Sequence, residues 1–422
     1  MRRLFGFSVL LTMCLAAVSS RAAPGTEEWL AEHDLDLHGF MDARAGARLQ
    51  DDPHEKDASL AEMRLQLDLS GYRDWGSFKL KGDLVGDGVT EEVLVQLREA
   101  NLLFSPLDFM DVKLGRQVIT WGTGDLLFIN DLFPKDWESF FIGRDSEYLK
   151  APTDAVRVSL FSGHANVDLV YVPIFNGSIY IDGDRLSYWN PLLARVAGQD
   201  FVFADQDRNR FPEDSEYALR VYRNFGGVET SLYGYNGFWK TPEGMDPAMV
   251  SLTYPRLTVY GASARGPVWD GIGNIEAGYY DSREDRDGSD PLVRNSEWRL
   301  LIGYERELAS DFTAAVQYYL EWMQEYDDYR RMAGPFAKDE YRHVFTLRLT
   351  RLLMNQNLRL SLFAYYSPSD EDGYLRPNIH FKITDQWAME GGCNIFFGNS
   401  DHTFFAQFEK NSNLYLGVRR TF

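Results

Sequence analysis

The first chemical question is whether the chain carries the residues of an enzyme. The sequence contains none of the short motifs that mark a nucleophile elbow, a zinc protease or a phosphate-binding loop. Residues 285–290 (Asp-Arg-Asp-Gly-Ser-Asp) hint at calcium, but Arg283 and Arg294 stand where an EF-hand loop has its first and last acidic ligands. His343 and His380 have no second histidine at ligand spacing. We therefore predict no catalytic residue, no metal site, no cofactor and no enzymatic activity.

Charged side chains recur instead in short segments where every second residue is apolar, as in 63–70. A β-strand presents successive side chains to opposite faces, so such charges gather on one face. If the strands close into a barrel, this face lines the lumen. Two interpretations stay open, namely charges that pair across neighbouring strands and a basic ladder that guides an anion. The predicted lumen-wall residues are Arg64, Lys79, Lys81, Arg157, Arg220, Arg299, Arg348, Arg359, Lys382 and Glu390.

A second unusual group lies in residues 122–153, which join two predicted strands. This loop carries a run of large apolar residues from Leu126 to Phe133, and a solvent-exposed loop has little reason to do so. We expect it to fold into the barrel and to form a pore constriction. The charges expected to set the field there are Asp125, Asp131, Lys135 and Asp136.

Residues 174–214 form an alternative constriction, because this longer loop also carries large aromatic residues such as Trp189 and Phe201. A third alternative is that both loops cap the external rim and lie against lipopolysaccharide.

The elements that position these residues are predicted strands. Period-2 alternation recurs along the chain, and helical periodicity is not sustained after the first residues. The 18 predicted strands are 35–49, 60–73, 75–86, 93–104, 110–121, 154–162, 164–173, 215–225, 227–237, 254–265, 271–282, 297–308, 311–324, 341–353, 356–366, 373–383, 386–397 and 413–422.

The connections between these strands alternate strictly between short and long. Asp74-Trp75 and Gly226-Gly227 are among the short ones, whereas 122–153 and 174–214 are long. Outer-membrane barrels have tight periplasmic turns and long extracellular loops, but a soluble sandwich has no reason to sort its loops. The pattern predicts an all-β transmembrane antiparallel barrel of about 18 strands over residues 23–422. Tryptophans expected at the two membrane interfaces are Trp75, Trp121, Trp298, Trp322 and Trp387.

Residues 1–22 have the features of a signal peptide. Arg2 and Arg3 precede an apolar run, and Ser20 and Ala22 supply small residues before the expected cleavage site after Ala22. A lipoprotein signal ending before Cys14 is the alternative. The leader predicts export, and with the barrel it predicts the outer membrane of a Gram-negative cell.

The last predicted strand places Leu414, Leu416, Val418 and the terminal Phe422 on one face. This arrangement resembles the C-terminal signal by which bacterial outer-membrane barrels are recognised for insertion. The resemblance implies that the barrel-assembly machinery binds the strand ending at Phe422, and that the apolar faces contact outer-membrane lipids.

From Gly115 to Asp136 the sequence reads GRQVITWGTGDLLFINDLFPKD. This run resembles the strand-to-loop motif of a broad group of proteobacterial porin-like barrels. The group includes the alginate-export type, with 18 strands, and uncharacterised barrels found beside efflux components. The resemblance implies an outer-membrane location and passive passage of a solute.

The predicted function is a channel for small hydrophilic solutes, narrowed by an inward-folded loop. One alternative is a plugged structural or partner-binding barrel that serves an export or efflux assembly, and another is an outer-membrane enzyme. The formal net charge of −20 argues against nucleic acid as a partner, because nucleic acid is itself a polyanion.

Overall fold

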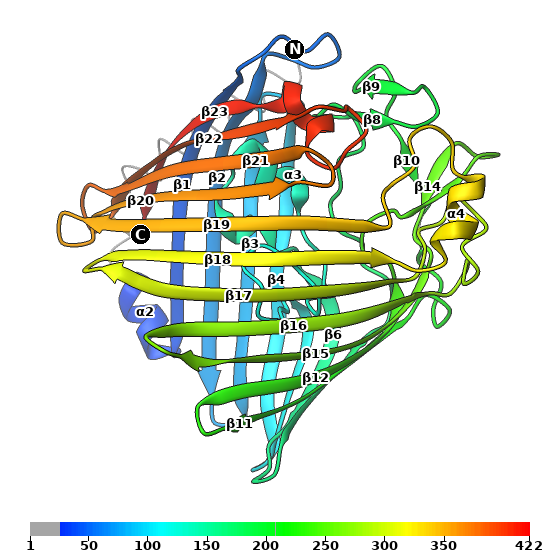
Figure 1. The fold of residues 1–422 in the computed structure, drawn as a ribbon. Helices are drawn as coiled ribbons and strands as arrows, with labels where there is room; N and C mark the ends of the chain where they lie inside the picture. The colour runs from blue at the N-terminus through cyan, green and yellow to red at the C-terminus, as the bar shows by residue number, and fades with distance from the viewer. Residues whose placement is uncertain (1–25, 207) are drawn as a thin grey trace.

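The computed structural model describes residues 26–206 and 208–422, so the predicted leader lies outside the described residues. Figure 1 shows a closed barrel, and the predicted 18-stranded sheet is confirmed. The barrel strands are β1 (Leu35–Arg48), β2 (Ala58–Arg73), β3 (Gly76–Asp87), β4 (Glu92–Leu107), β5 (Met110–Gln117), β6 (Thr153–Leu160), β7 (Asn166–Val172), β11 (Glu216–Phe225), β12 (Val228–Phe238), β15 (Arg256–Val268), β16 (Gly271–Ser282), β17 (Glu297–Ala309), β18 (Phe312–Met323), β19 (Tyr341–Leu353), β20 (Leu358–Ser367), β21 (Asp372–Lys382), β22 (Trp387–Gly398) and β23 (Asn413–Thr421).

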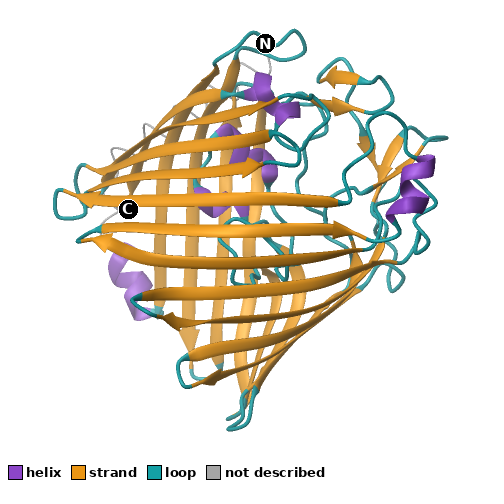
Figure 2. Cartoon of the chain, viewed as in Figure 1, coloured by secondary structure: helices purple, strands orange, loops and turns teal. Residues whose placement is uncertain are grey.

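The remaining elements are short and lie outside the barrel sheet (Figure 2). They are α2 (Thr26–Glu32), α3 (Trp137–Ile142), η1 (Ser146–Leu149), β8 (Tyr188–Asn190), β9 (Arg195–Ala197), β10 (Ala204–Asp205), β13 (Gly244–Asp246), β14 (Ser251–Thr253), α4 (Tyr326–Met332) and η2 (Ala406–Asn411). Among the described residues, no helix has the length and apolar character needed to cross a membrane.

The sheet closes because the last strand pairs with the first. β23 runs antiparallel to β1 from Phe40 opposite Thr421 to Arg48 opposite Asn413. Each barrel strand is therefore hydrogen-bonded on both edges. In a bilayer this closure is required, since an unpaired backbone N–H or C=O group in hydrocarbon costs several kcal/mol.

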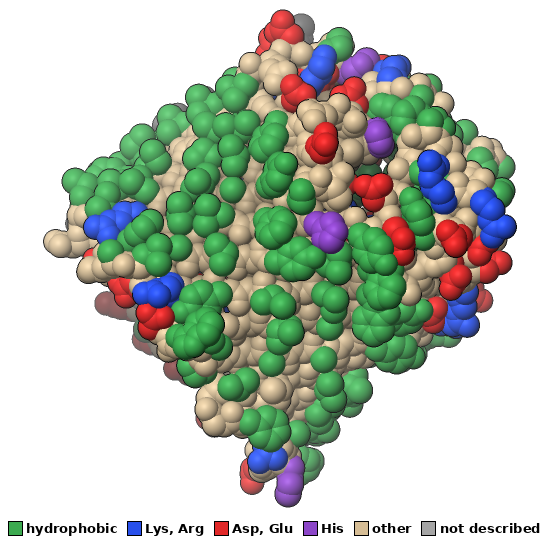
Figure 3. All heavy atoms as spheres, viewed as in Figure 1, with side chains coloured by type: hydrophobic (Ala, Val, Ile, Leu, Met, Phe, Trp, Pro, Cys, Tyr) green, Lys and Arg blue, Asp and Glu red, His purple; other side chains and the backbone are tan. Residues whose placement is uncertain are grey.

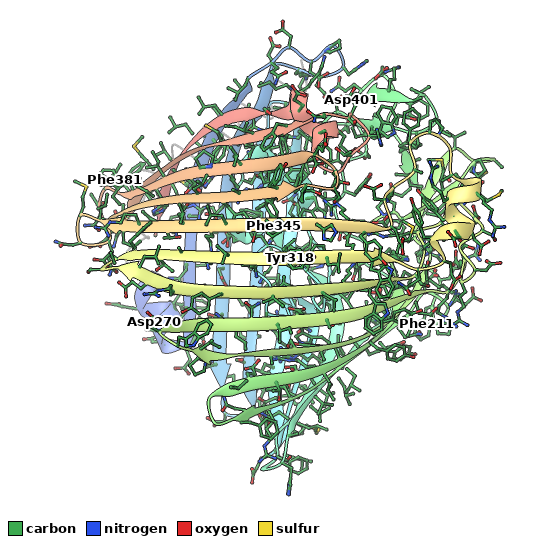
Figure 4. All side chains as sticks on the ribbon, in the orientation of Figure 1. Phe211, Asp270, Tyr318, Phe345, Phe381 and Asp401 are labelled. Carbon is green, nitrogen blue, oxygen red and sulfur yellow. The ribbon has the colours of Figure 1, made fainter. Side chains whose placement is uncertain are left out.

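The two faces of the barrel differ as the alternation predicts. On β19, the side chains of Val344 and Thr346 are buried inside, whereas Phe345 between them is half exposed on the outside. Figure 4 labels Phe345 and its neighbour Tyr318 on this outer surface. Figure 3 shows apolar side chains over the strands, with most charged side chains gathered toward the long-loop end. An apolar outer band of this kind is expected on a barrel whose wall contacts lipid.

Long and short connections alternate along the chain, as predicted. The short turns gather at the end of the barrel where α2 lies, and the long loops gather at the opposite, extracellular end (Figure 1). Gly226 and Gly227 form one of the tight turns with φ values of 60° and 94°. Positive φ at both central residues suits a two-residue hairpin, because its twist matches that of the strands.

The predicted interface position is wrong for one tryptophan. Trp75, Trp298, Trp322 and Trp387 lie at strand ends with exposed rings, but Trp121 is only 8% exposed. β5 ends at Gln117 rather than at residue 121, and the chain then turns inward. The Trp121 ring packs at 5.0 Å from the Phe133 ring and at 6.1 Å from the Tyr233 ring.

Candidate functional site

The residues between β5 and β6, 118–152, enter the barrel, and we call them the inner segment. Figure 1 shows α3, which is part of this segment, enclosed by the strands. Its side chains contact inward-facing residues of strands far from β5 in the sheet. The Phe140 ring lies 5.9 Å from that of Tyr374 on β21, and Arg144 donates to Glu62 on β2.

The first part of the inner segment, residues 122–130, attaches to β16. The buried carboxylate of Glu276 accepts hydrogen bonds from the backbone of Thr123 at 2.7 Å and of Asn130 at 2.7 Å. Tyr280, on the same strand, donates its hydroxyl hydrogen to the carbonyl of Ile129. Both ends of this turn are thus held against one wall strand.

The middle of that turn faces β17 to β20. Asp125 forms an ion pair with Arg348, which also contacts Glu305 at 2.7 Å. The Tyr365 hydroxyl donates to the carbonyl of Leu126 at 2.9 Å. Leu126 has a φ of 57°, an uncommon conformation for a residue with a side chain, so the surrounding contacts must hold it there.

Helix α3 forms because both of its ends are capped. Asp136 accepts a hydrogen bond from the Ser139 amide at 2.7 Å, which satisfies an otherwise unpaired donor at the N-terminus. Gly143 ends the helix with a φ of 89°, and a side chain there would collide with the Tyr415 ring. Between the caps, Phe140 and Phe141 pack against aromatic side chains of β21 and β22.

A buried charge cluster attaches the end of α3 to β2 and β3. Arg144 pairs with Glu62, and Arg64 pairs with Asp83 at 2.6 Å. Arg185, from the loop between β7 and β11, pairs with Asp87 at the end of β3. Hydrogen-bonded guanidinium groups of this kind satisfy carboxylates that would otherwise be costly to bury.

Glu138 lies at the edge of this cluster, 3.3 Å from Arg144 and 3.5 Å from Arg185. Burial raises its pKa to about 7, although the Arg144 charge opposes that rise. For Arg144 the carboxylates outweigh the effect of burial, and its pKa is raised above the ordinary arginine value.

The predicted constriction residues separate into two kinds. The Asp125 side chain is 33% exposed and stays accessible. Asp131 and Lys135 pair with each other at 3.0 Å and are 2% and 4% exposed, and Asp136 is buried as the helix cap. Asp131, Lys135 and Asp136 therefore bind partners within the segment, and their predicted place in the constriction stays a prediction.

Most predicted wall residues pair with acids, and four of them, Arg64, Lys79, Arg157 and Arg220, do so across neighbouring strands. Arg157 contacts Asp168 at 3.1 Å, and Arg220 contacts Glu229 at 2.6 Å. The Arg359 side chain is exposed near the periplasmic end of β20. The other pairs are Arg64–Asp83, Lys79–Asp68, Lys79–Glu99, Lys81–Glu147, Arg299–Glu297, Arg348–Glu305, Lys382–Asp385 and Arg44–Glu390.

Burial divides the inner wall into two zones. Every barrel strand has an inward side chain that is less than 9% exposed, and we call this set the buried ring. It includes Asp42, Arg64, Asp83, Asn101, Gln117, Ala155, Val170, Ala218, Tyr233, Val259, Glu276, Leu301, Tyr319, Val344, Phe363, Tyr374, Asn394 and Tyr415.

The second zone is the periplasmic vestibule, formed by inward residues nearer the short turns. Its members are partly or fully exposed, and they include Asp68, Lys79, Lys113, Arg157, Arg220, Arg265, Arg348, Arg359, His380 and Lys382. A cavity of about 510 Å³ opens beside Asp68, where β1 and β23 close the barrel. Asp125 lies where the ring meets the vestibule, since its partners Arg348 and Glu305 are both partly exposed.

Residues 174–214 cover the inner segment from the extracellular side. The Ile179 amide donates to the carbonyl of Lys135 at 2.8 Å, and Ile179 accepts from the Trp137 amide at 3.0 Å. The two long loops therefore form one contiguous structure.

Sequence reasoning missed the residues that attach this structure to the wall. Asp42, Arg44 and Glu62 lie on the polar faces of predicted strands, so the period-2 pattern contained a signal for them. Arg144 and Arg185 lie in irregular loops, where no periodicity marks a partner.

No protein-family model matches the sequence, and a search of curated proteins finds no match. Solved structures do resemble the fold. OccAB3 of Acinetobacter baumannii has a TM-score of 0.57 at 10% identity, covering 92% of this chain and 99% of its own. OccK11 (OpdR) of Pseudomonas aeruginosa has a TM-score of 0.53 at 10% identity, covering 92% and 96%.

A mutant of the Rh. blastica porin is more distant, with a TM-score of 0.43 at 12% identity, covering 92% of this chain and 100% of its own. At these identities the likeness concerns the fold alone. The chain has the architecture of a porin-like outer-membrane β-barrel.

Proposed function

We propose that the protein is a passive channel for small hydrophilic solutes, and that the inner segment forms its narrowest level. The observation that carries the proposal is the buried ring. Each of the 18 strands has a covered inward side chain, which supports a route for the solute along the inner segment and the loop over it rather than along the strands. The resemblance of Gly115 to Asp136 to alginate-export-type barrels supports the same function and stays a prediction.

Charge also favours a polar solute. The vestibule is lined by ion pairs with exposed members, such as Arg220 and Glu229, which keep water and hydrophilic molecules in contact with the wall. At the narrowest level, Asp125 is the predicted constriction residue that stays accessible. In a passage with low-dielectric walls, one such charge weighs more than many charges at the mouth.

Single-channel recording in a planar bilayer tests the proposal. We expect discrete conductance steps from the purified protein, and smaller steps than an unobstructed barrel of this size would give.

A plugged barrel that serves as a structural or partner-binding component is the second candidate. It is favoured by the convergence of both long loops on one buried cluster, where Arg144 contacts Glu62 and Arg185 contacts Asp87. Such a protein would give no conductance steps in the same bilayer experiment.

An enzyme would need a nucleophile beside a base at one rim. His54 and Asp200 pair at 3.0 Å in the extracellular loops. The other ring nitrogen of His54 faces Arg195 at 3.4 Å rather than a hydroxyl, so this pair does not support nucleophilic catalysis.

A further inference from the structure

One buried carboxylate of the wall binds only the inner segment. Glu276 is 1% exposed, and no Lys, Arg or His of residues 26–206 and 208–422 forms an ion pair with it. Its Oε2 atom accepts from the Thr123 amide at 2.7 Å, the Thr123 hydroxyl at 3.0 Å and the Gly124 amide at 3.2 Å. Its Oε1 atom accepts from the amide and the side chain of Asn130, at 2.7 Å and 3.0 Å.

The wall around Glu276 is shaped to receive this turn. A side chain at Gly278 would come within 2.8 Å of Ile129, and one at Gly261 would collide with the Asn130 amide group. From the segment side, Gly122 has a φ of 80°, and its Cβ would lie 2.8 Å from Glu276. Glycine is thus needed at three contact points, two on the wall and one on the turn.

Further hydrogen bonds fix the register of the turn on the wall. Asn274 donates to the carbonyl of Thr123 at 3.1 Å, and Tyr280 donates to the carbonyl of Ile129. Thr123 and Asn130 flank Asp125, so the wall holds both ends of the stretch that carries the accessible charge.

We infer that Glu276 is the positioning residue of the constriction. It holds residues 122–130 against β16 and thereby orients Asp125 toward the passage. This inference rests on the proposed function for its consequence, because the conductance should depend on a residue that the solute does not contact. A carboxylate is required there because all five of its bonds come from N–H or O–H donors. A neutral amide would turn an NH2 group toward some of these donors and leave them unpaired.

The test compares Glu276→Gln with Glu229→Gln in a Cys393→Ser background. Glu229 is a matched control, because it also lies on the inner wall but pairs with Arg220 rather than with the inner segment. Ile129→Cys serves as reporter, since Ile129 is fully buried against Gly278 and β16 when the turn is seated. The readouts are the labelling rate with a water-soluble maleimide and the single-channel conductance.

We expect Glu276→Gln to speed labelling at position 129 by about 10-fold or more, as release of a local contact does. It should also raise the conductance and its fluctuation, whereas Glu229→Gln should leave the labelling rate at position 129 unchanged. Labelling that stays as slow with Glu276→Gln as with the control would overturn the inference. Faster labelling with unchanged conductance would support the seating role and contradict the proposed constriction, so the two failures are distinguishable.

Gly261→Ala provides a second route if Glu276→Gln does not fold. The added methyl group displaces Asn130 without touching the carboxylate, and the same acceleration of labelling is expected. Slow labelling at position 129 in this variant would show that the placement of residues 122–130 does not depend on their contacts with the wall.

Discussion

The buried ring and the periplasmic vestibule use the same kind of ion pair for different purposes. In the ring, Arg144 and Glu62 are 10% and 3% exposed, and the pair joins the inner segment to the wall. In the vestibule, Arg220 and Glu229 are 17% and 51% exposed, and the pair joins two neighbouring strands. The first pair is buried and attaches the inner segment, whereas the second is exposed and neutralises charge on the wall. Because a buried carboxylate depends on its partner far more than an exposed one, loss of the first pair should cost more stability than loss of the second.

The largest expected difference between the two zones is in solvent access. Val259 and Arg265 lie on β15 with side chains facing inward, one in the ring and one in the vestibule. In a Cys393→Ser background, a charged maleimide should label Arg265→Cys about 100-fold faster than Val259→Cys, as for sites separated by a local opening of a few kcal/mol. Tyr260→Cys, on the lipid face, controls for detergent effects. Equal rates at 259 and 265 would remove the distinction between the zones.

A smaller but still large difference is expected in stability. Arg144→Ala leaves Glu62 buried without its main partner, which costs about 3–5 kcal/mol. Arg220→Ala breaks an exposed pair and should cost about 1 kcal/mol or less. Denaturant unfolding of the two purified variants measures both values. Similar losses for both would mean that the buried cluster does not attach the segment.

Ion selectivity should respond to one of the three predicted acidic residues. Asp125→Asn should shift the reversal potential in a salt gradient toward less cation preference, whereas Asp131→Asn and Asp136→Asn should leave it nearly unchanged in folded protein. Burial raises the pKa of Asp125 while Arg348 opposes the rise, so the cation preference should fade at higher pH than for an ordinary aspartate. A selectivity change with Asp131→Asn would place that residue at the lumen after all.

The smallest expected effect is a pH dependence of the contacts that attach the inner segment to the wall. The pKa of Glu138 is raised from 4.5 to about 7 in the folded protein. Because the pKa of Glu138 is higher in the folded than in the unfolded protein, protonation of this carboxyl stabilises the folded state. This contribution is complete below the pKa of the unfolded state and is lost as the pH rises through about 7. Conductance fluctuation should therefore increase from about pH 5 to about pH 8, and Glu138→Gln should reduce that dependence. The same pH response in Glu138→Gln would assign it to another group.

The fold could be predicted from the sequence to a large extent, because closing a barrel imposes a period of two and sorts the loops by length. The predicted strand ends lie within three residues of the observed ones except at β5. There the strand ends at Gln117, and the Trp121 ring packs on Phe133 and Tyr233 instead of continuing the alternation. The inward course of residues 122–153 followed from their apolar content. The partners of Asp131 and Asp136 could not be predicted, because an ion pair and a helix cap inside a loop produce no periodic pattern in the sequence.

The buried charge cluster around Arg144 could likewise be predicted only in part. Glu62 could be assigned to an inward face, but nothing in the sequence links it to Arg144, which lies 82 residues away in the chain. Glu276 was predicted only as one acidic residue of a strand, and its role depends on three glycines and five donors that only the folded chain brings together.

In the proposed function the barrel is a channel, and the inner segment sets its narrowest level. The most direct test is the single-channel conductance of the wild-type protein beside a variant lacking Leu126 to Phe133, a deletion that removes most of the part of the inner segment that packs on β16. We expect small steps for the wild-type protein and steps several-fold larger for the folded deletion variant, because the resistance of a pore is concentrated at its narrowest part. Identical conductance in the two proteins, with the deletion variant folded, would contradict the proposed function.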